Sequence, residues 1–332
     1  MSSTRARYLV TGGAGFIGSN IVAALARAGE RVRAFDNLAT GHWALVDRLA
    51  GRSELVERVT GDIRDGAALA RAMEGVEVVF HQAALASVPR SVDDPVENDE
   101  VNTHGTVKVL DAARRLGVKR VVFAASSAVY GDGPEQPKHE GLAPAPLSPY
   151  AVAKLTAEYY LKVFASLYGL ETVGLRYFNI FGPNQLPSGP YAAAIPRFLH
   201  AAVSGGRITV FGDGEQTRDF CFVDNAVRAN LLAANSPKKL AGEIVNVATG
   251  RSVSLNGVLR ALEGVVGGPL QVDYVDPKPG DVRHSSATID RARELLGYEP
   301  KVRWEDGLGP THAFLKALHE RGLEPLGAAG PG

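Results

Sequence analysis

The 332-residue chain has a single cysteine, no net charge, and no apolar run long enough to span a bilayer. One cysteine excludes an internal disulfide and a metal cage built from cysteines, which fits a reducing cytoplasm. That cysteine, Cys221, lies in the apolar stretch Asp219–Val223, so we expect a buried core thiol and not a nucleophile. We predict no metal site.

The balance of charge excludes a second group of functions. Lys and Arg together number 36, as do Asp and Glu. Bulk electrostatics therefore give no reason to expect nucleic acid or an acidic membrane as a partner, and an anionic ligand needs a local basic site. The chain runs within a few residues into the strand-like Tyr8–Thr11, which leaves no room for the apolar region of a signal peptide. We therefore expect a cytoplasmic protein.

Short apolar, β-branched runs alternate with longer helical patterns such as Phe16–Ala28 and Val107–Leu116. The runs are Tyr8–Val10, Val32–Phe35, Leu55–Val59, Val76–Phe80, Val121–Ala124 and Thr172–Leu175. This alternation predicts βαβ units, and right-handed crossovers then give an α/β fold with a doubly wound parallel sheet of the Rossmann type. Proline and glycine become frequent after Arg176. We predict a main domain over residues 1–179 and a smaller C-terminal α/β region over residues 180–325 that returns some elements to the main sheet.

Three glycines, Gly12, Gly15 and Gly18, follow the first predicted strand and open the first predicted helix. Glycines in this context allow a tight turn and a close backbone approach, while free N–H groups at the helix start bind pyrophosphate. Asp36, near the end of the second strand, can accept hydrogen bonds from ribose hydroxyls and would repel a 2′-phosphate. No arginine immediately follows it. The predicted cofactor is therefore NAD, with NADP less favoured, and residues 1–179 are its binding domain.

Two further segments follow predicted strands in the order that a dinucleotide requires. Asp62 and Ile63, after the third strand, could touch the adenine edge. Gln82, Ala83, Ala84 and Leu85, after the fourth strand, leave room for the dinucleotide backbone. Each segment alone is a weak indication, and their order along the chain is what favours a cofactor site.

Tyr150 and Lys154 stand four residues apart at the start of a helical pattern, and Ser126 and Ser127 end the fifth predicted strand. A spacing of four places an ammonium beside a phenol, where it favours the ionised phenol, and an oxidised nicotinamide adds further positive charge. Strand ends are where an open α/β sheet places its ligands. We predict that Tyr150 acts as a general base and that Ser126 helps pass the substrate proton to it.

Residues from about 7 to 310 resemble the extended short-chain dehydrogenase/reductase family, and within it the nucleotide-sugar 4-epimerases. The segments that carry the resemblance are Thr11–Gly18, Ser126–Gly131, Tyr150–Lys154, Leu175–Asn179, Gly214–Phe220 and Pro279–Asp281. The resemblance implies that Tyr150 deprotonates the sugar 4-hydroxyl as the C4 hydride moves to NAD. The resulting 4-keto sugar then rotates and takes the hydride back on its other face.

The resemblance also assigns residues to each part of the site. The catalytic residues are Tyr150, Lys154 and Ser126. The cofactor-binding residues are Gly12, Gly15, Phe16, Ile17, Gly18, Asp36, Asn37, Leu38, Thr40, Gly41, Asp62, Ile63, Gln82, Ala83, Ala84, Leu85, Asn102, Tyr150, Lys154 and Phe178. The substrate-binding residues are Ser87, Arg90, Ser126, Ser127, Tyr150, Asn179, Ala193, Ala194, Thr209, Phe211, Arg218, Lys278, Asp281 and Ser285.

Two positions separate this chain from related patterns. Where the family usually has arginine three residues before Asp281, the chain has Lys278, so Arg283 could take part of the role of binding the diphosphate. In the resemblance, the dehydratases and decarboxylases of the family carry a carboxylate residue before Val-Tyr-Gly. This chain has Ala128 at that position. We therefore predict reversible epimerisation, with no dehydration or decarboxylation.

The sugar is the most open part of the prediction. In the family, tyrosine at the position of Ser285 restricts the pocket to plain hexoses, and a smaller residue admits a 2-acetamido group. Serine therefore favours UDP-GlcNAc and UDP-GalNAc, with UDP-glucose and UDP-galactose as an accompanying or main pair. UDP-glucuronate stays open because Arg90 or Arg197 could meet a 6-carboxylate. Apolar residues on more than one face of 98–116 and 148–167 favour a homodimer.

Overall fold

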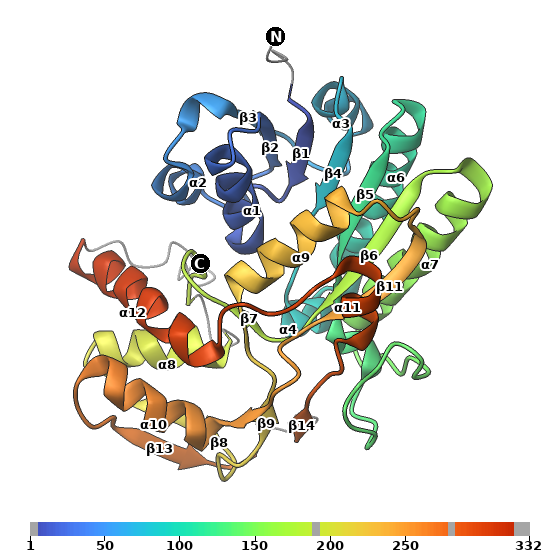
Figure 1. Cartoon of the computed structure of the whole chain (residues 1–332). Helices are drawn as coiled ribbons and strands as arrows, with labels where there is room; N and C mark the ends of the chain where they lie inside the picture. The colour runs from blue at the N-terminus through green and yellow to red at the C-terminus, as the bar shows by residue number, and fades with distance from the viewer. Residues whose placement is uncertain (1–5, 188–192, 278–282, 322–332) are drawn as a thin grey trace.

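A computed structural model describes residues 6–187, 193–277 and 283–321, and its centre is a seven-stranded parallel sheet. The strand order is β11-β6-β5-β4-β1-β2-β3 (Figure 1). The strands are β1 Tyr8–Thr11, β2 Val32–Asp36, β3 Val56–Thr60, β4 Val78–His81, β5 Arg120–Ser126, β6 Glu171–Tyr177 and β11 Ala241–Val247. This is the predicted doubly wound α/β sheet. The six predicted strands lie within two residues of their observed bounds, although Leu55 belongs to a short 3₁₀ turn, Ser53–Leu55, before β3.

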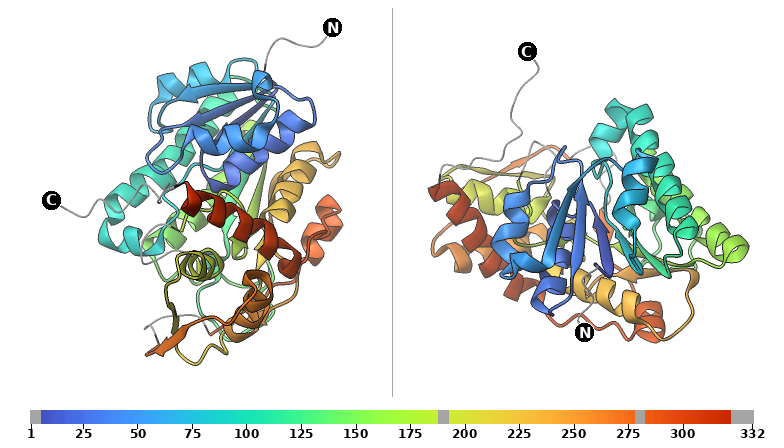
Figure 2. Two further views of the ribbon diagram at one scale, coloured as in Figure 1. Left: turned by 90° about the vertical axis from the view of Figure 1, so that its left-hand side faces the viewer. Right: turned by 90° about the horizontal axis from the view of Figure 1, so that it is seen from above.

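Helices cover both faces of the sheet, as the view from above in Figure 2 shows. One face buries a core with Ile21, Val46 and Ala229, and the other a core with Leu69 and Leu110. The helices of the first face are α1 Phe16–Arg27, α2 Trp43–Ala50 and α9 Val223–Asn235, and those of the second are α3 Gly66–Met73, α6 Gly105–Arg115 and α7 Pro149–Tyr168. The central strands are buried on both sides, which explains their nearly continuous apolar sequences.

Short helical elements lead from β4 into α6. These are α4 Val88–Asp93, α5 Pro95–Asp99 and a π-helical turn, Glu100–His104. A 3₁₀ turn, Ser127–Tyr130, follows β5. These elements all lie beyond the carboxyl ends of β4 and β5, which is the edge of the sheet where ligands bind in open α/β folds.

The later part of the chain builds a smaller group of elements, at the lower left of Figure 1. It contains α8 Ala194–Val203, α10 Leu255–Val266 and α12 Trp304–Glu320, with the parallel pair β8 Ile208–Phe211 and β13 Val272–Val275. Two small sheets join it to the rest: β7 Ile180–Phe181 with β10 Cys221–Phe222, and β9 Thr217–Arg218 between β12 Val253–Ser254 and β14 His284–Ser285. Helix α11 Asp290–Leu296 packs near β11. The division at residue 180 stays a prediction, while β11 and α9 lie on the main sheet.

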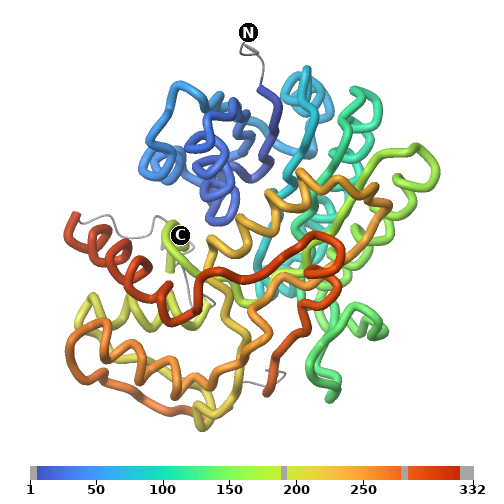
Figure 3. Tube along the Cα trace, in the orientation of Figure 1, coloured from blue at the N-terminus to red at the C-terminus, as the bar shows by residue number. Residues whose placement is uncertain are grey.

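The loop after β5 and the segment of β14 are far apart in sequence but run side by side below the main sheet, as the chain trace in Figure 3 shows. Gln136 Nε2 donates to the carbonyl oxygen of His284 at 2.8 Å, and Lys138 N donates to that of Ser286 at the same distance. The loop after β5 therefore supports β14.

Cys221 is fully buried, as expected from its apolar surroundings. Within the described ranges no helix has both the length and the apolar character needed to cross a membrane.

Candidate active site

The glycine turn after β1 leaves no room for side chains. Gly12 has a φ of +67°, and a Cβ there would lie 2.7 Å from the backbone nitrogen of Ala83. A Cβ on Gly18 would lie 2.0 Å from the carbonyl oxygen of Gly12. Helix α1 begins directly after Gly15, so its first turn, with Phe16 and Ile17, presents free N–H groups beside this turn. The turn is thus a cradle for an anionic group that must approach the backbone closely.

Asp36, at the end of β2, holds the loop beside that cradle. Its Oδ2 accepts from the N–H of Ala14 at 3.0 Å, and its Oδ1 accepts from that of Leu38 at 2.8 Å. A Cβ on Gly41 would lie 2.9 Å from the same Oδ1, so the loop that also contains Thr40 closes tightly on the carboxylate. Each oxygen has a further lone pair, and Asp36 can still accept from a diol.

The end of β3 contributes a carboxylate that is held by its neighbours. Asp62 accepts from the guanidinium of Arg64 at 2.8 and 3.0 Å and from Asn37 Nδ2 at 2.9 Å. These bonds, those of Arg64 above all, hold the pKa of Asp62 well below its usual range. Asn37, Asp62 and the neighbouring Ile63 thus form one wall of the site next to the loop after β2.

The loop after β4 is fixed by its side chains and its backbone. The side chain of Gln82 contacts Asn230 of α9 and the hydroxyl of Tyr177, both at 3.2 Å. Gln82 can therefore serve a cofactor mainly through its backbone. Asn102, in the π-helical turn, accepts from the N–H of Leu85 at 2.8 Å and donates to its carbonyl oxygen at 3.1 Å. The loop is thus held at Gln82 from α9 and β6 and at Leu85 from Asn102.

The structure brings the three predicted catalytic residues together. Ser126, at the end of β5, hydrogen-bonds with the side chain of Tyr150, and its Oγ also accepts from the N–H of Ala128 at 3.2 Å. Lys154 is 3% exposed, its Nζ donates to the carbonyl oxygen of Ala124 at 2.9 Å, and it lies 5.8 Å from the centre of the Tyr150 ring. The spacing of four thus places the ammonium on the side of the helix that faces the phenol.

The electrostatics differ from the expectation that Lys154 lowers the pKa of Tyr150. Burial raises the pKa of Tyr150 above its usual value of 10.0, and the hydrogen bond with Ser126 opposes that rise without cancelling it. Burial also lowers the pKa of Lys154 to about 7, while the charge of Glu158 acts in the opposite direction. The expected lowering of the pKa of Tyr150 is therefore wrong for the groups of the protein taken alone, because the burial of the phenol outweighs its hydrogen bond with Ser126.

Helix α7 begins where it does because Ser148 caps it and Pro149 occupies its first turn. Ser148 Oγ accepts from the N–H of Ala151 at 3.2 Å. The next free N–H, that of Tyr150, donates to Ser91 Oγ of α4 at 3.1 Å. Ser91 is fully buried, so α4 fixes the start of the helix that carries the phenol.

The predicted substrate residues lie on several elements. Ser285 of β14 stands opposite Arg218 of β9, and Arg218 Nη1 donates to the carbonyl oxygens of Thr217 and Arg283 at 2.9 and 3.3 Å. Asn179 has a φ of +37°, and its Nδ2 donates to the carbonyl oxygen of Asp219 at 3.2 Å. Ser87 caps α4, Ser127 begins the turn after β5, and Ala193 and Ala194 begin α8. Lys278 and Asp281 lie outside the described residues.

Other predicted cations have protein partners. Arg283 pairs with Asp213 at 2.8 Å, and Arg90 pairs with Glu97 at 2.7 Å. Arg197 donates to the carbonyl oxygen of Thr209 at 3.2 Å and lies 5.6 Å from the ring centre of Phe211. Arg197 thus belongs with the β8 segment. Phe178 is fully buried and its N–H donates to the carbonyl oxygen of Val247 at 3.0 Å, so the residue packs behind the site.

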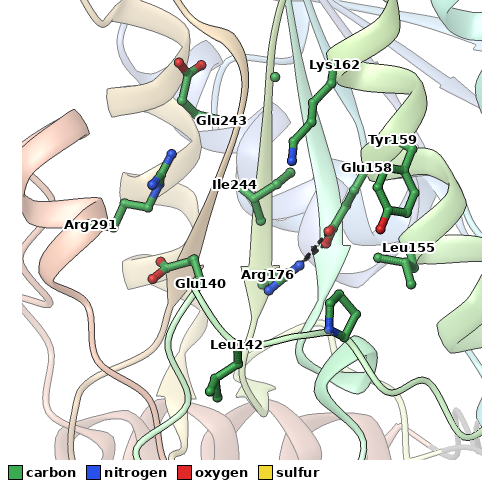
Figure 4. A pocket seen from close by; sticks show the side chains of 12 residues that line it. Glu140, Leu142, Leu155, Glu158, Tyr159, Lys162, Arg176, Glu243, Ile244 and Arg291 are labelled. Carbon is green, nitrogen blue, oxygen red and sulfur yellow. Dashed lines mark hydrogen bonds and ion pairs between the residues drawn. The ribbon is translucent and has the colours of Figure 1, made fainter.

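A cavity of about 230 Å³ lies apart from these residues, between α7, β6 and β11 (Figure 4). Its wall contains the ion pair between Glu158 and Arg176, in which Nη2 and Nε of the arginine donate to the two carboxylate oxygens at 2.7 and 2.9 Å. Both side chains are at most 5% exposed. Glu158 follows Lys154 by one helical turn on the same face of α7, so this pair lies next to the catalytic residues and acts on the pKa of Lys154 through its charge.

Sequence reasoning missed the supporting residues His81 and Ser91. Both are buried: His81 ends β4 directly before the predicted residue Gln82, and Ser91 lies on α4 next to the predicted residue Arg90. A histidine directly after the apolar run Val78–Phe80 was the available indication for the first, because a buried polar group needs a partner. Within the described ranges, no group of three or more His, Cys, Asp or Glu side chains is arranged to hold a metal ion.

Known proteins that are similar to this chain belong to one family. Residues 8–248 match the NAD dependent epimerase/dehydratase family. The chain is 39% identical over 312 residues to the UDP-glucose 4-epimerase of Mycolicibacterium smegmatis, a match that covers 93% of this chain and 98% of that protein. Both chains therefore align over nearly their whole length.

Two solved structures are similar over nearly the whole chain. The UDP-N-acetylglucosamine 4-epimerase from Methanobrevibacter ruminantium, in complex with UDP-N-acetylmuramic acid, is 38% identical with a TM-score of 0.89, and the match covers 95% of this chain and 99% of that one. The UDP-glucuronic acid 4-epimerase from Bacillus cereus, in complex with UDP-glucuronic acid and NAD, is 30% identical with a TM-score of 0.85, covering 94% and 99%. The similar structures thus include epimerases of two different UDP-sugars.

Proposed function

We propose that this chain, which belongs to the NAD dependent epimerase/dehydratase family and within it to the UDP-sugar 4-epimerases, interconverts UDP-GlcNAc and UDP-GalNAc. UDP-glucose and UDP-galactose form a second, accompanying pair. The observation that carries the choice of sugar is the small side chain of Ser285 directly opposite Arg218. A serine beside the arginine that anchors the diphosphate leaves space for a 2-acetamido group.

The cofactor of this family fits the residues present. Gly12 packs closely on the backbone of Ala83, and Gly18 packs on the carbonyl group of Gly12, so the free N–H groups at the start of α1 lie beside the end of β1, where the pyrophosphate would bind. The carboxylate of Asp36 retains lone pairs for the ribose hydroxyls. Burial of Asp36, at 8% exposure, disfavours the additional phosphate of NADP. When bound, NAD supplies a hydride acceptor and donor for the sugar C4 and a positive charge near the phenol.

Tyr150 takes the proton of the 4-hydroxyl and later returns it, because its phenol is hydrogen-bonded to Ser126 at the carboxyl end of β5. Ser126 orients the hydroxyl and shares its proton. Lys154, fixed by the carbonyl oxygen of Ala124, holds the nicotinamide ribose. The positive charge of a bound nicotinamide would add to that of Lys154 and offset the burial that raises the pKa of Tyr150.

Arg218 and Asn179 bind the diphosphate, and Thr209 and Phe211 meet the uracil. A guanidinium presents a fork of N–H donors that suits phosphate oxygens. Arg218 lies on β9, and Asn179 holds the carbonyl oxygen of Asp219, the residue that follows Arg218, so both positions are fixed by the same backbone. Lys278 and Asp281, outside the described residues, complete this set in the proposal.

The turn after β5 favours epimerisation over the other reactions of a 4-keto sugar. Ala128 stands where a dehydratase or decarboxylase would need a carboxylate, and its N–H only donates to Ser126 Oγ. No acid or base is thereby offered for protons at C5 or C6. UDP-glucuronate, the remaining alternative, is less favoured because Arg90 pairs with Glu97 and Arg197 faces the β8 segment.

An epimerisation panel with purified protein tests the proposal. UDP-GlcNAc, UDP-glucose and UDP-glucuronate are incubated separately, and the 4-epimers are separated by capillary electrophoresis. We expect UDP-GalNAc from UDP-GlcNAc with no accumulation of NADH. Steady formation of NADH would identify a dehydrogenase, and the absence of any 4-epimer would leave a cofactor-binding protein without this catalysis.

Substitution of Ser285 tests the observation behind the choice of sugar. Ser285→Tyr should lower UDP-GlcNAc conversion at least about tenfold more than UDP-galactose conversion, because a bulky side chain excludes the acetamido group. Ser285→Ala is the matched control and should convert both sugars as the wild type does. An equal loss on both sugars in Ser285→Tyr would contradict the role of this position.

The proposal includes a homodimer in the cytoplasm. Large apolar side chains are exposed on α4, α5 and α7, among them Val92, Val96 and Val152. These helices pack side by side, so their apolar side chains can form one surface for a second copy of the chain.

A further inference from the structure

A buried histidine stands at the dinucleotide edge of the sheet and has no part in the chemistry described above. His81 ends β4 and is 1% exposed. Its Nδ1 lies 2.8 Å from Thr11 Oγ1, at the end of β1, and its Nε2 lies 3.0 Å from Thr106 Oγ1, on α6. One imidazole ring therefore joins three elements.

The neighbouring contacts decide which atom donates in each bond. Thr106 has one hydroxyl hydrogen, which it donates to the carbonyl oxygen of Asn102 at 2.6 Å. Thr106 Oγ1 must therefore accept from the Nε2–H of His81. Nδ1 then carries no hydrogen and accepts from the hydroxyl of Thr11, which in turn accepts from the N–H of Ala83 at 3.3 Å. The chain of bonds runs in one direction from the Ala83 amide to the Asn102 carbonyl group.

One end of this chain lies in the loop that faces the glycine turn, and the other end lies at the residue that holds this loop. Ala83 is the residue whose nitrogen would lie 2.7 Å from a Cβ on Gly12. Asn102 holds the N–H and the carbonyl oxygen of Leu85 with its side-chain amide. It lies in a π-helical turn, a geometry that often occurs at functional sites. The segment from Ala83 to Leu85 is thus tied at its start through Thr11 and at its end through Asn102.

We propose that His81 is a positioning residue for the dinucleotide, and that its neutral imidazole, protonated on Nε2, fixes the Ala83–Leu85 loop against the glycine turn. The loop and the turn form two sides of the cofactor cradle. A break in the chain of bonds leaves a buried donor or acceptor unpaired and lets the loop shift relative to Gly12. Bound NAD should then be held less tightly.

The surroundings of the ring keep it neutral. Burial lowers the pKa of His81 to about 3, and the positive charge of Lys154, from α7 on the same side of the sheet, acts in the same direction. Its two direct partners are uncharged hydroxyls. The direction of the bonds should therefore stay the same over the whole working pH range of the enzyme.

Nitrogen NMR of the purified holoenzyme tests the protonation state. In protein labelled with ¹⁵N at histidine, long-range ¹H–¹⁵N correlations distinguish a protonated from an unprotonated ring nitrogen, and His81 is assigned from the signals that move in Thr106→Ser. We expect a protonated Nε2 and an unprotonated Nδ1 that do not titrate between about pH 5 and 9. A protonated Nδ1, or a titration within this range, would overturn the assigned bond direction.

Cofactor retention tests the positioning role separately from activity. Thr106→Val removes the acceptor for Nε2–H at nearly constant shape, and we expect NAD to leave the purified protein about tenfold faster, measured by ultrafiltration and assay of the released NAD. Thr106→Ser keeps the hydroxyl and should retain NAD as the wild type does. If Thr106→Val does not fold, Thr106→Ala removes the same acceptor with less crowding.

Thr311→Val is the matched control. Thr311 is also fully buried, and its hydroxyl also donates to the carbonyl oxygen four residues earlier, that of Gly307 at 2.7 Å, but it lies on α12 and has no histidine partner. This variant should lower the unfolding temperature without a change in NAD release. A Thr106→Val protein that loses thermal stability but releases NAD at the wild-type rate would reduce His81 to a purely structural residue and overturn the proposal.

Discussion

Tyr150 and Lys154 are affected in opposite ways by the same burial. Desolvation disfavours the charged form of each, so it raises the pKa of the phenol and lowers that of the amine to about 7. The buried carboxylate of Glu158, paired with Arg176, acts against the second effect. If Tyr150 is the base, as proposed, the phenol depends on the cofactor for the charge that lowers its pKa, and proton transfer should then require bound NAD.

Removal of the phenolic hydroxyl tests the role of Tyr150. Tyr150→Phe should lower kcat by a factor of about 10² to 10⁴, because general-base catalysis is lost while the ring still packs. NAD content, measured after denaturation of the purified protein, should not change. Tyr168→Phe, at the exposed end of α7, is the control and should be fully active. Turnover near that of the wild type in Tyr150→Phe would refute the assignment of the base.

The pKa of Lys154 predicts a stability that depends on pH. It lies near 7 in the folded protein and at 10.5 when unperturbed, so between these values the unfolded chain binds a proton that the folded protein does not. The contribution of Lys154 to stability therefore rises with pH through this window. In cofactor-stripped protein, Lys154→Met should raise the free energy of unfolding more at about pH 7 than at about pH 9. The difference between the two increases, measured by urea unfolding, should be about 2 to 3 kcal/mol.

The control for this pH dependence is Lys162→Met, on an exposed position of the same helix. Its effect on the free energy of unfolding should be independent of pH in the same range. A Lys154→Met effect that is equally constant would show that the amine is not desolvated as the structure indicates.

At the scale of elements, the junction of β1, the glycine turn and α1 depends on the absence of side chains. A Cβ on Gly18 meets a backbone oxygen that cannot move aside, whereas Gly66, the first residue of α3, has open space around it. Gly18→Ala should therefore abolish NAD binding or prevent folding, while Gly66→Ala should stabilise by about 0.5 to 1 kcal/mol through its effect on the unfolded chain. Calorimetric titration with NAD and thermal unfolding measure both. NAD affinity of the wild-type order in Gly18→Ala would contradict the tight closure of the turn.

The sequence predicted those elements whose structure depends on the local pattern of apolar residues and glycines. The strands from β1 to β6 follow from apolar runs, and the glycine turn follows from spacing, because both depend on local residues. Strand β11 completes the sheet from a distant part of the chain, which no local pattern can place. For the same reason the partners of Gln82 on α9 and β6 could not be read from its own motif.

Some properties of the site residues could likewise be predicted from local spacing, and others depend on tertiary contacts. The spacing of Tyr150 and Lys154 predicted that they lie together, and the structure agrees. The balance between desolvation and charge depends on how much protein surrounds the pair, so the direction of the pKa of Tyr150 could not be obtained from spacing. The charges of Arg90 and Arg283 look available in the sequence, but tertiary contacts give each of them a carboxylate partner.

At the scale of the whole molecule, α7 presents an apolar stripe to the outside. Val152, Tyr159, Val163 and Leu167 are between 43% and 69% exposed, and their spacings of seven, four and four place them along one face of the helix. Val92 and Val96, on the adjoining α4 and α5, are 61% and 68% exposed. A surface of this kind is typical of helix packing between subunits, so its covering by a second copy would bury side chains that otherwise cost solubility.

A charge in this stripe should separate the subunits. Val152→Glu places two desolvated carboxylates in a symmetric helix contact, so the protein should elute with the mass of one chain in chromatography with light scattering, while the wild type shows the mass of two. The control is Val275→Glu, at an exposed position of β13 away from α7, which should leave the mass unchanged. Since Val152 lies only two residues from both Tyr150 and Lys154, separation of the subunits should also lower kcat. A Val152→Glu protein that keeps the mass of two chains would place the subunit contact on another face.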